Sequence, residues 1–126
     1  MKSPPTFDAV NEARDLYLPG SAGLQWSGRR ATEMARVVKA HGPTAPVDAL
    51  HGMVAYHLAG DGSYDPLRHL TPETFWQAAK LDKYLDADRG ARAAGLTRPY
   101  TSAQTERGAD AAVRRILARK REGAGR

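Results

Sequence analysis

The sequence predicts an all-α protein, folded as a single compact bundle of about five to six short helices with a basic C-terminal helix. Apolar residues recur at helical spacing, and no segment shows the convincing alternation of a strand. Ala and Leu are plentiful, whereas the β-branched residues that favour strands are sparse. The 126 residues are the length of one domain.

Composition limits the class of protein further. Hydrophobic residues make up 41% of the chain, which is enough to form a core. The absence of cysteine excludes disulfides, thiolate metal ligands and a cysteine nucleophile. No apolar run approaches the roughly 20 residues of a membrane span, and no signal-peptide apolar region follows the N-terminus. We therefore expect a cytoplasmic protein.

Two helices are expected in the first third of the chain. The first covers residues 7–18, with Thr6 as its cap, and Pro19 and Gly20 follow it. The second covers residues 29–41 and stops at Gly42-Pro43. Their apolar positions lie on one face each, as in helices that pack on a shared core.

A third helix is expected over residues 46–59. Its apolar stripe follows the i, i+3, i+7, i+11 pattern: Val47, Leu50, Val54 and Leu58. His51 and His57 flank this stripe, but six residues separate them, which is not the i, i+4 spacing that lets two imidazoles share a metal. We interpret both as packing or boundary histidines.

Residues 70–85 contain a helix start and a break in hydrophobic phase. Thr71 is suited to cap a helix, with Pro72 at the first helical position and Glu73 in the first turn. Phe75 and Trp76 do not share the stripe that follows, which is formed by Ala78, Leu81, Tyr84 and Leu85. The break predicts a short turn near 72–77 and a separate helix over about 78–94, with one uninterrupted helix as the alternative.

Gly95 is a natural C-terminal cap for either arrangement. A connector then leads to a final helix from residue 102 to about 121, and the last residues are expected to fray. We divide the chain into a helical domain over 1–100 and a basic helix with a frayed tail over 101–126.

Positive charge is concentrated at the C-terminal end. Residues 1–88 hold 9 Lys/Arg and 11 Asp/Glu, a net charge of −2. Residues 89–126 hold 10 Lys/Arg and 3 Asp/Glu, a net charge of +7. A positive end on a near-neutral body suggests a polyanion partner, most often nucleic acid, and the alternative is a solvated tail.

No catalytic constellation or metal site is recognisable, so we expect a non-enzyme without a cofactor. Asp82 and Asp86 share one face of a helix at i, i+4, and such a pair can hold a hard cation. Lys83 and Arg89 lie nearby, which favours ordinary salt-bridged carboxylates instead.

Two spaced phrases in the middle of the chain resemble a known family. The first is His69-Leu70-Thr71-Pro72-Glu73-Thr74-Phe75-Trp76, and the second is Lys80-Leu81-Asp82-Lys83-Tyr84-Leu85. Over roughly residues 9–88 the chain resembles the conserved C-terminal domain of phage replisome-organiser proteins, which is related to the DnaD-type domain of bacterial replication initiation. The resemblance implies DNA binding and remodelling, self-association and recruitment of the replicative helicase.

The leading hypothesis is a non-enzymatic DNA-binding accessory protein of phage or mobile-element replication. The candidate phosphate-contacting residues are Arg107, Arg114, Arg115, Arg119, Lys120 and Arg121. A candidate partner or base-stacking surface is Trp76, Leu81, Tyr84 and Tyr100, with Trp76 expected more strongly in the core. The alternative is a protein-interaction module that binds or inhibits a host or replication protein without binding DNA.

Overall fold

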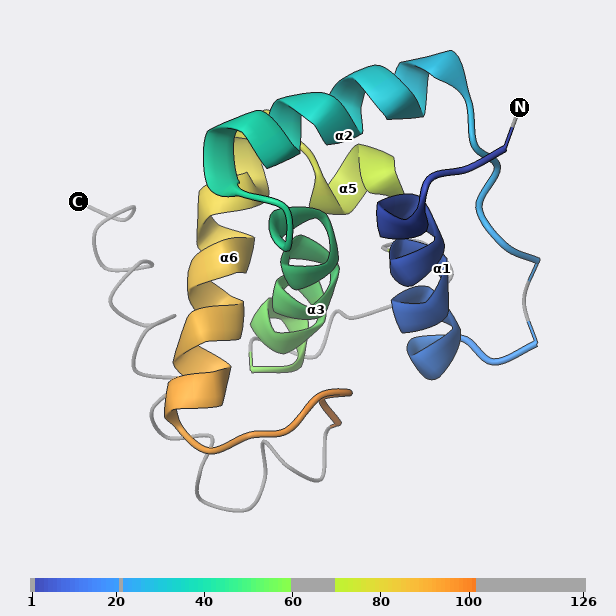
Figure 1. The fold of residues 1–126 in the computed structure, drawn as a ribbon. Helices are drawn as coiled ribbons and strands as arrows, with labels where there is room; N and C mark the ends of the chain where they lie inside the picture. The colour runs from blue at the N-terminus through green and yellow to red at the C-terminus, as the bar shows by residue number, and fades with distance from the viewer. Residues whose placement is uncertain (1, 21, 60–69, 102–126) are drawn as a thin grey trace.

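The computed structural model describes residues 2–20, 22–59 and 70–101 and shows five helices and no strand in them (Figure 1). The helices are α1 (Pro5–Tyr17), α2 (Gly28–His41), α3 (Ala45–Leu58), α5 (Pro72–Phe75) and α6 (Ala78–Ala93). The predicted all-α class is confirmed for these residues. The expected final helix from residue 102 lies outside the described residues.

Helix α3 is the centre of the bundle. In Figure 1, α6 lies on one side of α3 and α1 lies on the other side of α3. Helix α2 crosses above α3 and α6, and α5 lies beneath α2. The buried residues of α3 point in every direction around its axis: Ala45, Pro46, Ala49, Leu50, His51, Gly52, Met53, Val54 and Ala55. The predicted stripe is therefore only part of the buried surface: Leu50 and Val54 are fully buried, whereas Val47 and Leu58 are partly buried and pack against the core. A helix enclosed by its neighbours needs apolar or small residues on all sides.

Helices α3 and α6 approach most closely at Gly52. A Cβ atom at this position would lie 1.7 Å from the backbone carbonyl oxygen of Tyr84. Leu81 and Leu85 are buried on the same side of α6 as Tyr84. The absence of a side chain at Gly52 thus sets the distance between the two helices that form the largest contact of the fold.

The predicted break between residues 72–77 and the following helix is confirmed, and the uninterrupted alternative is wrong. Helix α5 ends at Phe75, and Gln77 is extended at φ −60° and ψ 124° before α6 begins. Phe75 and Trp76 are both fully buried. The indole Nε1 of Trp76 donates to the carbonyl of Pro46 at 3.1 Å, so the break turns both aromatic rings into the core.

Gly95 ends α6 as predicted. Its φ of 89° lies in the left-handed region, and its N–H donates to the carbonyl of Arg92 at 3.0 Å. The N–H of Leu96 donates to the carbonyl of Ala91 at 3.0 Å, which completes a Schellman motif. The reversal directs residues 96–101 back beneath α3.

The predicted cap of α1 was wrong by two residues. The helix begins at Pro5, with Pro4 as its N-cap residue, rather than after Thr6. Proline suits the first helical position because it has no N–H to satisfy and its φ is already helical. Within the described ranges, none of the helices is long and apolar enough to cross a bilayer.

We predict that Gly52→Ala lowers the free energy of unfolding by about 3 kcal/mol or more, because the new methyl group would overlap a backbone carbonyl. The clash is relieved only if α3 and α6 separate, which opens the core. Urea denaturation followed by circular dichroism measures the change.

Gly28→Ala is the matched control. Nothing lies within 4 Å of a Cβ at Gly28, which is the first residue of α2. We expect a change of less than about 1 kcal/mol, and in the stabilising direction. Equal losses in both variants would contradict the close approach at Gly52.

Candidate functional site

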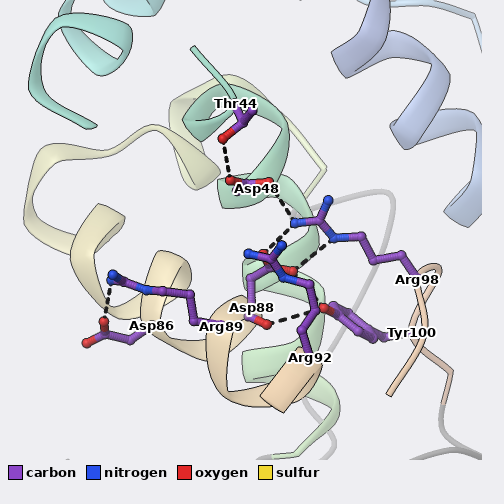
Figure 2. Close-up of polar contacts among 8 residues, drawn as sticks. All are labelled: Thr44, Asp48, Asp86, Asp88, Arg89, Arg92, Arg98 and Tyr100. Atoms are coloured by element: carbon purple, nitrogen blue, oxygen red, sulfur yellow. Dashed lines mark hydrogen bonds and ion pairs between the residues drawn. The ribbon is translucent and has the colours of Figure 1, made fainter. Parts of the chain in front are cut away.

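Asp88 on α6 is a fully buried carboxylate and the centre of a polar cluster (Figure 2). Arg98 Nε donates to Asp88 Oδ1 at 3.0 Å, and Arg98 Nη2 donates to Asp88 Oδ2. The same Nη2 donates to Oδ1 of Asp48, on α3, at 2.7 Å. Arg98 therefore bridges α3 and α6 from the segment that follows them.

Two further side chains interact with the carboxylate of Asp88. The hydroxyl of Tyr100 donates to Asp88 Oδ1 at 2.6 Å. Arg92 Nη2 lies 3.0 Å from Asp88 Oδ2, one helical turn along α6. We call these residues the Asp88 cluster: Asp48, Asp88, Arg92, Arg98 and Tyr100. It holds two carboxylates and two guanidinium groups, so its formal charges cancel.

The cluster changes the ionisation of its members. Burial by itself lowers the pKa of Arg98, but its hydrogen bonds to Asp88 and Asp48 outweigh burial and raise that pKa above its ordinary value. Burial raises the pKa of the Tyr100 phenol, and the hydrogen bond to Asp88 raises it further. Both side chains therefore keep their protons throughout the neutral range.

A hydrogen-bonded chain links the cluster to α1. The N–H of Tyr100 donates to the hydroxyl oxygen of Tyr17 at 3.2 Å, and that hydroxyl lies 2.6 Å from Nδ1 of His51. A neutral His51 with its proton on Nε2 accepts from Tyr17 at Nδ1. Burial, followed by the charge of Arg98, lowers the pKa of His51 to about 4. The predicted packing role of His51 is confirmed, with a hydrogen bond that the sequence did not reveal.

The arrangement fixes residues 96–101 against three helices. In Figure 1 this segment leaves the lower end of α6 and passes beneath α3 toward α1. Arg98 and Tyr100 are its two anchors, and both are paired with groups of the body. The Asp88 cluster thus fixes residues 96–101 on the helical body.

The described ranges contain no group of three His, Asp or Glu side chains that could hold a metal ion. Asp86 pairs with Arg89 at 2.7 Å, and Asp82 lies 3.7 Å from the imidazole of His41. The ion-paired interpretation is confirmed for Asp86. Asp82 lies beside His41 rather than Lys83, whose ammonium group lies 4.5 Å from the centroid of the Tyr56 ring. The expectation of a non-enzyme stays a prediction.

The candidate surface of Trp76, Leu81, Tyr84 and Tyr100 was wrong as a surface. All four side chains are at most 2% exposed. Trp76 and Tyr84 lie at the contacts of α3 with α5 and α6, and Tyr100 is held against Asp88. Large aromatic side chains stabilise a fold strongly when they are buried, because each removes a large apolar area from water. None of them is accessible for stacking on bases.

The structure also shows which basic residues of segment 89–126 are paired with carboxylates of the same chain. Arg89, Arg92 and Arg98 belong to the 10 basic residues of segment 89–126, and each pairs with a carboxylate of the same chain. The remaining seven fall in residues 102–126, which hold three acidic residues and a net charge of +4. The predicted phosphate contacts lie outside the described residues: Arg107, Arg114, Arg115, Arg119, Lys120 and Arg121.

Comparison with protein-family models, with curated proteins and with solved structures found no match for this chain. The class of protein therefore follows from its own fold and charges: a small helical body on which residues 96–101 are anchored by a buried ion-pair cluster. The i, i+4 spacing of Asp88 and Arg92 was one visible signal of this cluster. Nothing local in the sequence marked Arg98 or Asp48 as their partners.

We predict that Asp88→Asn lowers the free energy of unfolding by about 3–5 kcal/mol. The substitution keeps the shape of the side chain but leaves the two guanidinium groups of Arg92 and Arg98 with one carboxylate, that of Asp48, in the cluster. Urea denaturation monitored by circular dichroism gives the difference.

Asp86→Asn, on the same helix, is the control. Its pair with Arg89 is exposed to solvent, so its loss should cost less than about 1 kcal/mol. If Asp88→Asn proved as mild as Asp86→Asn, the Asp88 cluster would not be what fixes residues 96–101.

The lowered pKa of His51 predicts a dependence of stability on pH. Because the folded pKa of about 4 is below the ordinary 6.5, the unfolded chain binds the proton more tightly. The contribution of His51 is full above pH 6.5 and is lost as pH falls toward 4, to a total of about 3 kcal/mol. His51→Gln keeps an acceptor for Tyr17 but cannot titrate. Urea denaturation between pH 4 and 6.5 should show a smaller rise of the free energy of unfolding with pH for this variant, by up to the equivalent of one proton. An unchanged pH dependence would contradict the assignment.

Proposed function

We propose that this chain is a non-enzymatic, cytoplasmic DNA-binding accessory protein of phage or mobile-element replication. The observation that carries the proposal is the division of positive charge. The arginines at the end of α6 and in the following connector pair with carboxylates of the body, whereas residues 102–126 carry a net charge of +4. That segment begins directly after the anchor at Tyr100.

The proposed mechanism is contact with phosphates rather than with bases. Lysine and arginine side chains that neutralise phosphates release condensed counterions, which gives affinity with little sequence preference. Arginine adds bidentate contacts to phosphate oxygens. The contacting residues are Arg107, Arg114, Arg115, Arg119, Lys120 and Arg121. The body then supplies a stable attachment for this segment.

The role in replication rests on the resemblance of residues 9–88 to the replisome-organiser family. In that role the protein remodels DNA or recruits the replicative helicase. The succession of helices and the separate helical turn at α5 are compatible with it. The DNA contacts and the replication role are separable, since the former depend on charge alone.

A protein-interaction module that does not bind DNA is the second candidate. One observation favours it: a mainly apolar pocket of about 410 Å³ lies between the start of α1 and the turn before α3, lined in part by Pro5, Ala9, Pro43 and Val47. Against it, the predicted apolar patch around Trp76 is buried. Leu16, at 55% exposed, is the one large apolar side chain that stands out to solvent in the described part of the chain.

We predict that the full chain binds duplex or single-stranded DNA with an affinity that falls by about two to three orders of magnitude between 50 and 200 mM salt. Replacing Arg114, Arg115, Arg119, Lys120 and Arg121 together by Ala should remove most of this affinity and flatten the salt dependence. Fluorescence anisotropy of labelled oligonucleotides measures both quantities.

Replacement of Lys80 and Arg89 by Ala is the control for general charge loss, because both residues lie on α6 and not in residues 102–126. This control should leave binding within a few-fold of the parent chain. Binding that survives the five substitutions would remove the proposed site, and a parent chain without affinity for DNA would favour the second candidate.

A further inference from the structure

The outward face of α2 carries a row of cations. Arg29, Arg36 and Lys39 are exposed and follow i, i+7 and i+10 spacing, which places them on one side of the helix. The buried residues Met34 and Val37 occupy the opposite side. The first and last cations are ten residues apart, or about 15 Å along the axis.

The charge of this face is largely uncompensated. Glu33 is the single acidic residue of α2, and it lies 3.6 Å from Arg29, which remains 78% exposed. Arg36 Nη2 donates to the carbonyl of Trp76 at 2.8 Å, a bond that holds the guanidinium in place without cancelling its charge. Arg30 differs, because it is turned toward Glu73 and is 19% exposed.

Helix α1 shows the opposite pattern. Asp8, Glu12 and Asp15 are exposed and lie at i, i+4 and i+7 on its outward face. The helical body therefore has a negative row on α1 and a positive row on α2, although its total charge is close to zero. A body polarised in this way is oriented by the field of a polyanion, with α2 toward it and α1 away.

We propose that the outward face of α2 is a second DNA-contacting surface, with Arg29, Arg36 and Lys39 binding phosphates of the nucleic acid held by residues 102–126. This inference rests on the proposed function. Glu33, paired with Arg29, is the one acidic side chain on this face, and the exposed side chains of Thr32, Ala35 and Ala40 beside the cations are small. Phosphates can therefore approach the three cations without steric obstruction.

The site is electrostatic and sequence-independent. A duplex presents one negative charge per about 1.7 Å of its axis, so a face 15 Å long meets more phosphates than it has cations. The face and the C-terminal segment then act on one ligand, which raises the overall affinity above that of either alone.

The test compares two double variants of the full chain that lose the same charge. Arg29→Gln with Lys39→Gln removes the two ends of the row, and Lys80→Gln with Arg89→Gln removes two exposed cations of α6. Anisotropy titrations with a 20-base-pair duplex over 50–200 mM salt give the affinity and its salt slope. Urea denaturation verifies that both variants remain folded.

We expect the α2 variant to bind at least about tenfold more weakly at 50 mM salt, with a slope smaller by about 2, and the α6 variant to change little. Equal losses in the two variants, or no loss in the α2 variant, would overturn the second surface and leave the proposed function standing. A parent chain that fails to bind DNA would overturn both. Weaker binding in the five-fold C-terminal variant and, separately, in the α2 variant supports both sites.

Discussion

The fold depends on how a buried negative charge is balanced. Asp88 is fully buried on α6, and its carboxylate is stable there because Arg98, Arg92 and Tyr100 supply charge and hydrogen bonds. Since Arg98 also contacts Asp48 on α3, the same interaction joins the central helix to α6. The position of residues 96–101 is thus a consequence of an electrostatic requirement and not of apolar packing alone.

Ion pairing within the chain separates the positive charges of the described residues into two groups. Arg89, Arg92 and Arg98 pair with carboxylates of their own chain, and Arg30 pairs with Glu73. The cations on the outward face of α2 lie outside the Asp88 cluster, although Arg29 lies 3.6 Å from Glu33, and the cations beyond residue 101 lie outside the described residues. A count of charges from the sequence cannot separate these groups, because pairing is a property of distance. The proposals on DNA binding depend on that separation.

Local patterns predicted the helix ends well where a residue's neighbours in the sequence decide its conformation. The change of hydrophobic phase after Trp76 correctly predicted the break before α6, and Gly95 correctly predicted its end, since both are decided by near neighbours. Patterns missed most of the buried surface of α3, because its surroundings decide which of its faces are buried. They also failed for Tyr84 and Tyr100, where the same aromatic type suits a core or a binding surface equally.

The sequence by itself determined the helical class, most helix boundaries and the excess of positive charge near the C-terminus, because these follow from composition and short-range spacing. The tertiary structure decided that Gly52 is the point of closest approach between α3 and α6, and that Asp48, Asp88 and Arg98 form one cluster. Asp48 and Arg98 are fifty residues apart in the chain. Contacts between such distant residues exist only once the helices have packed, so no local pattern contains them.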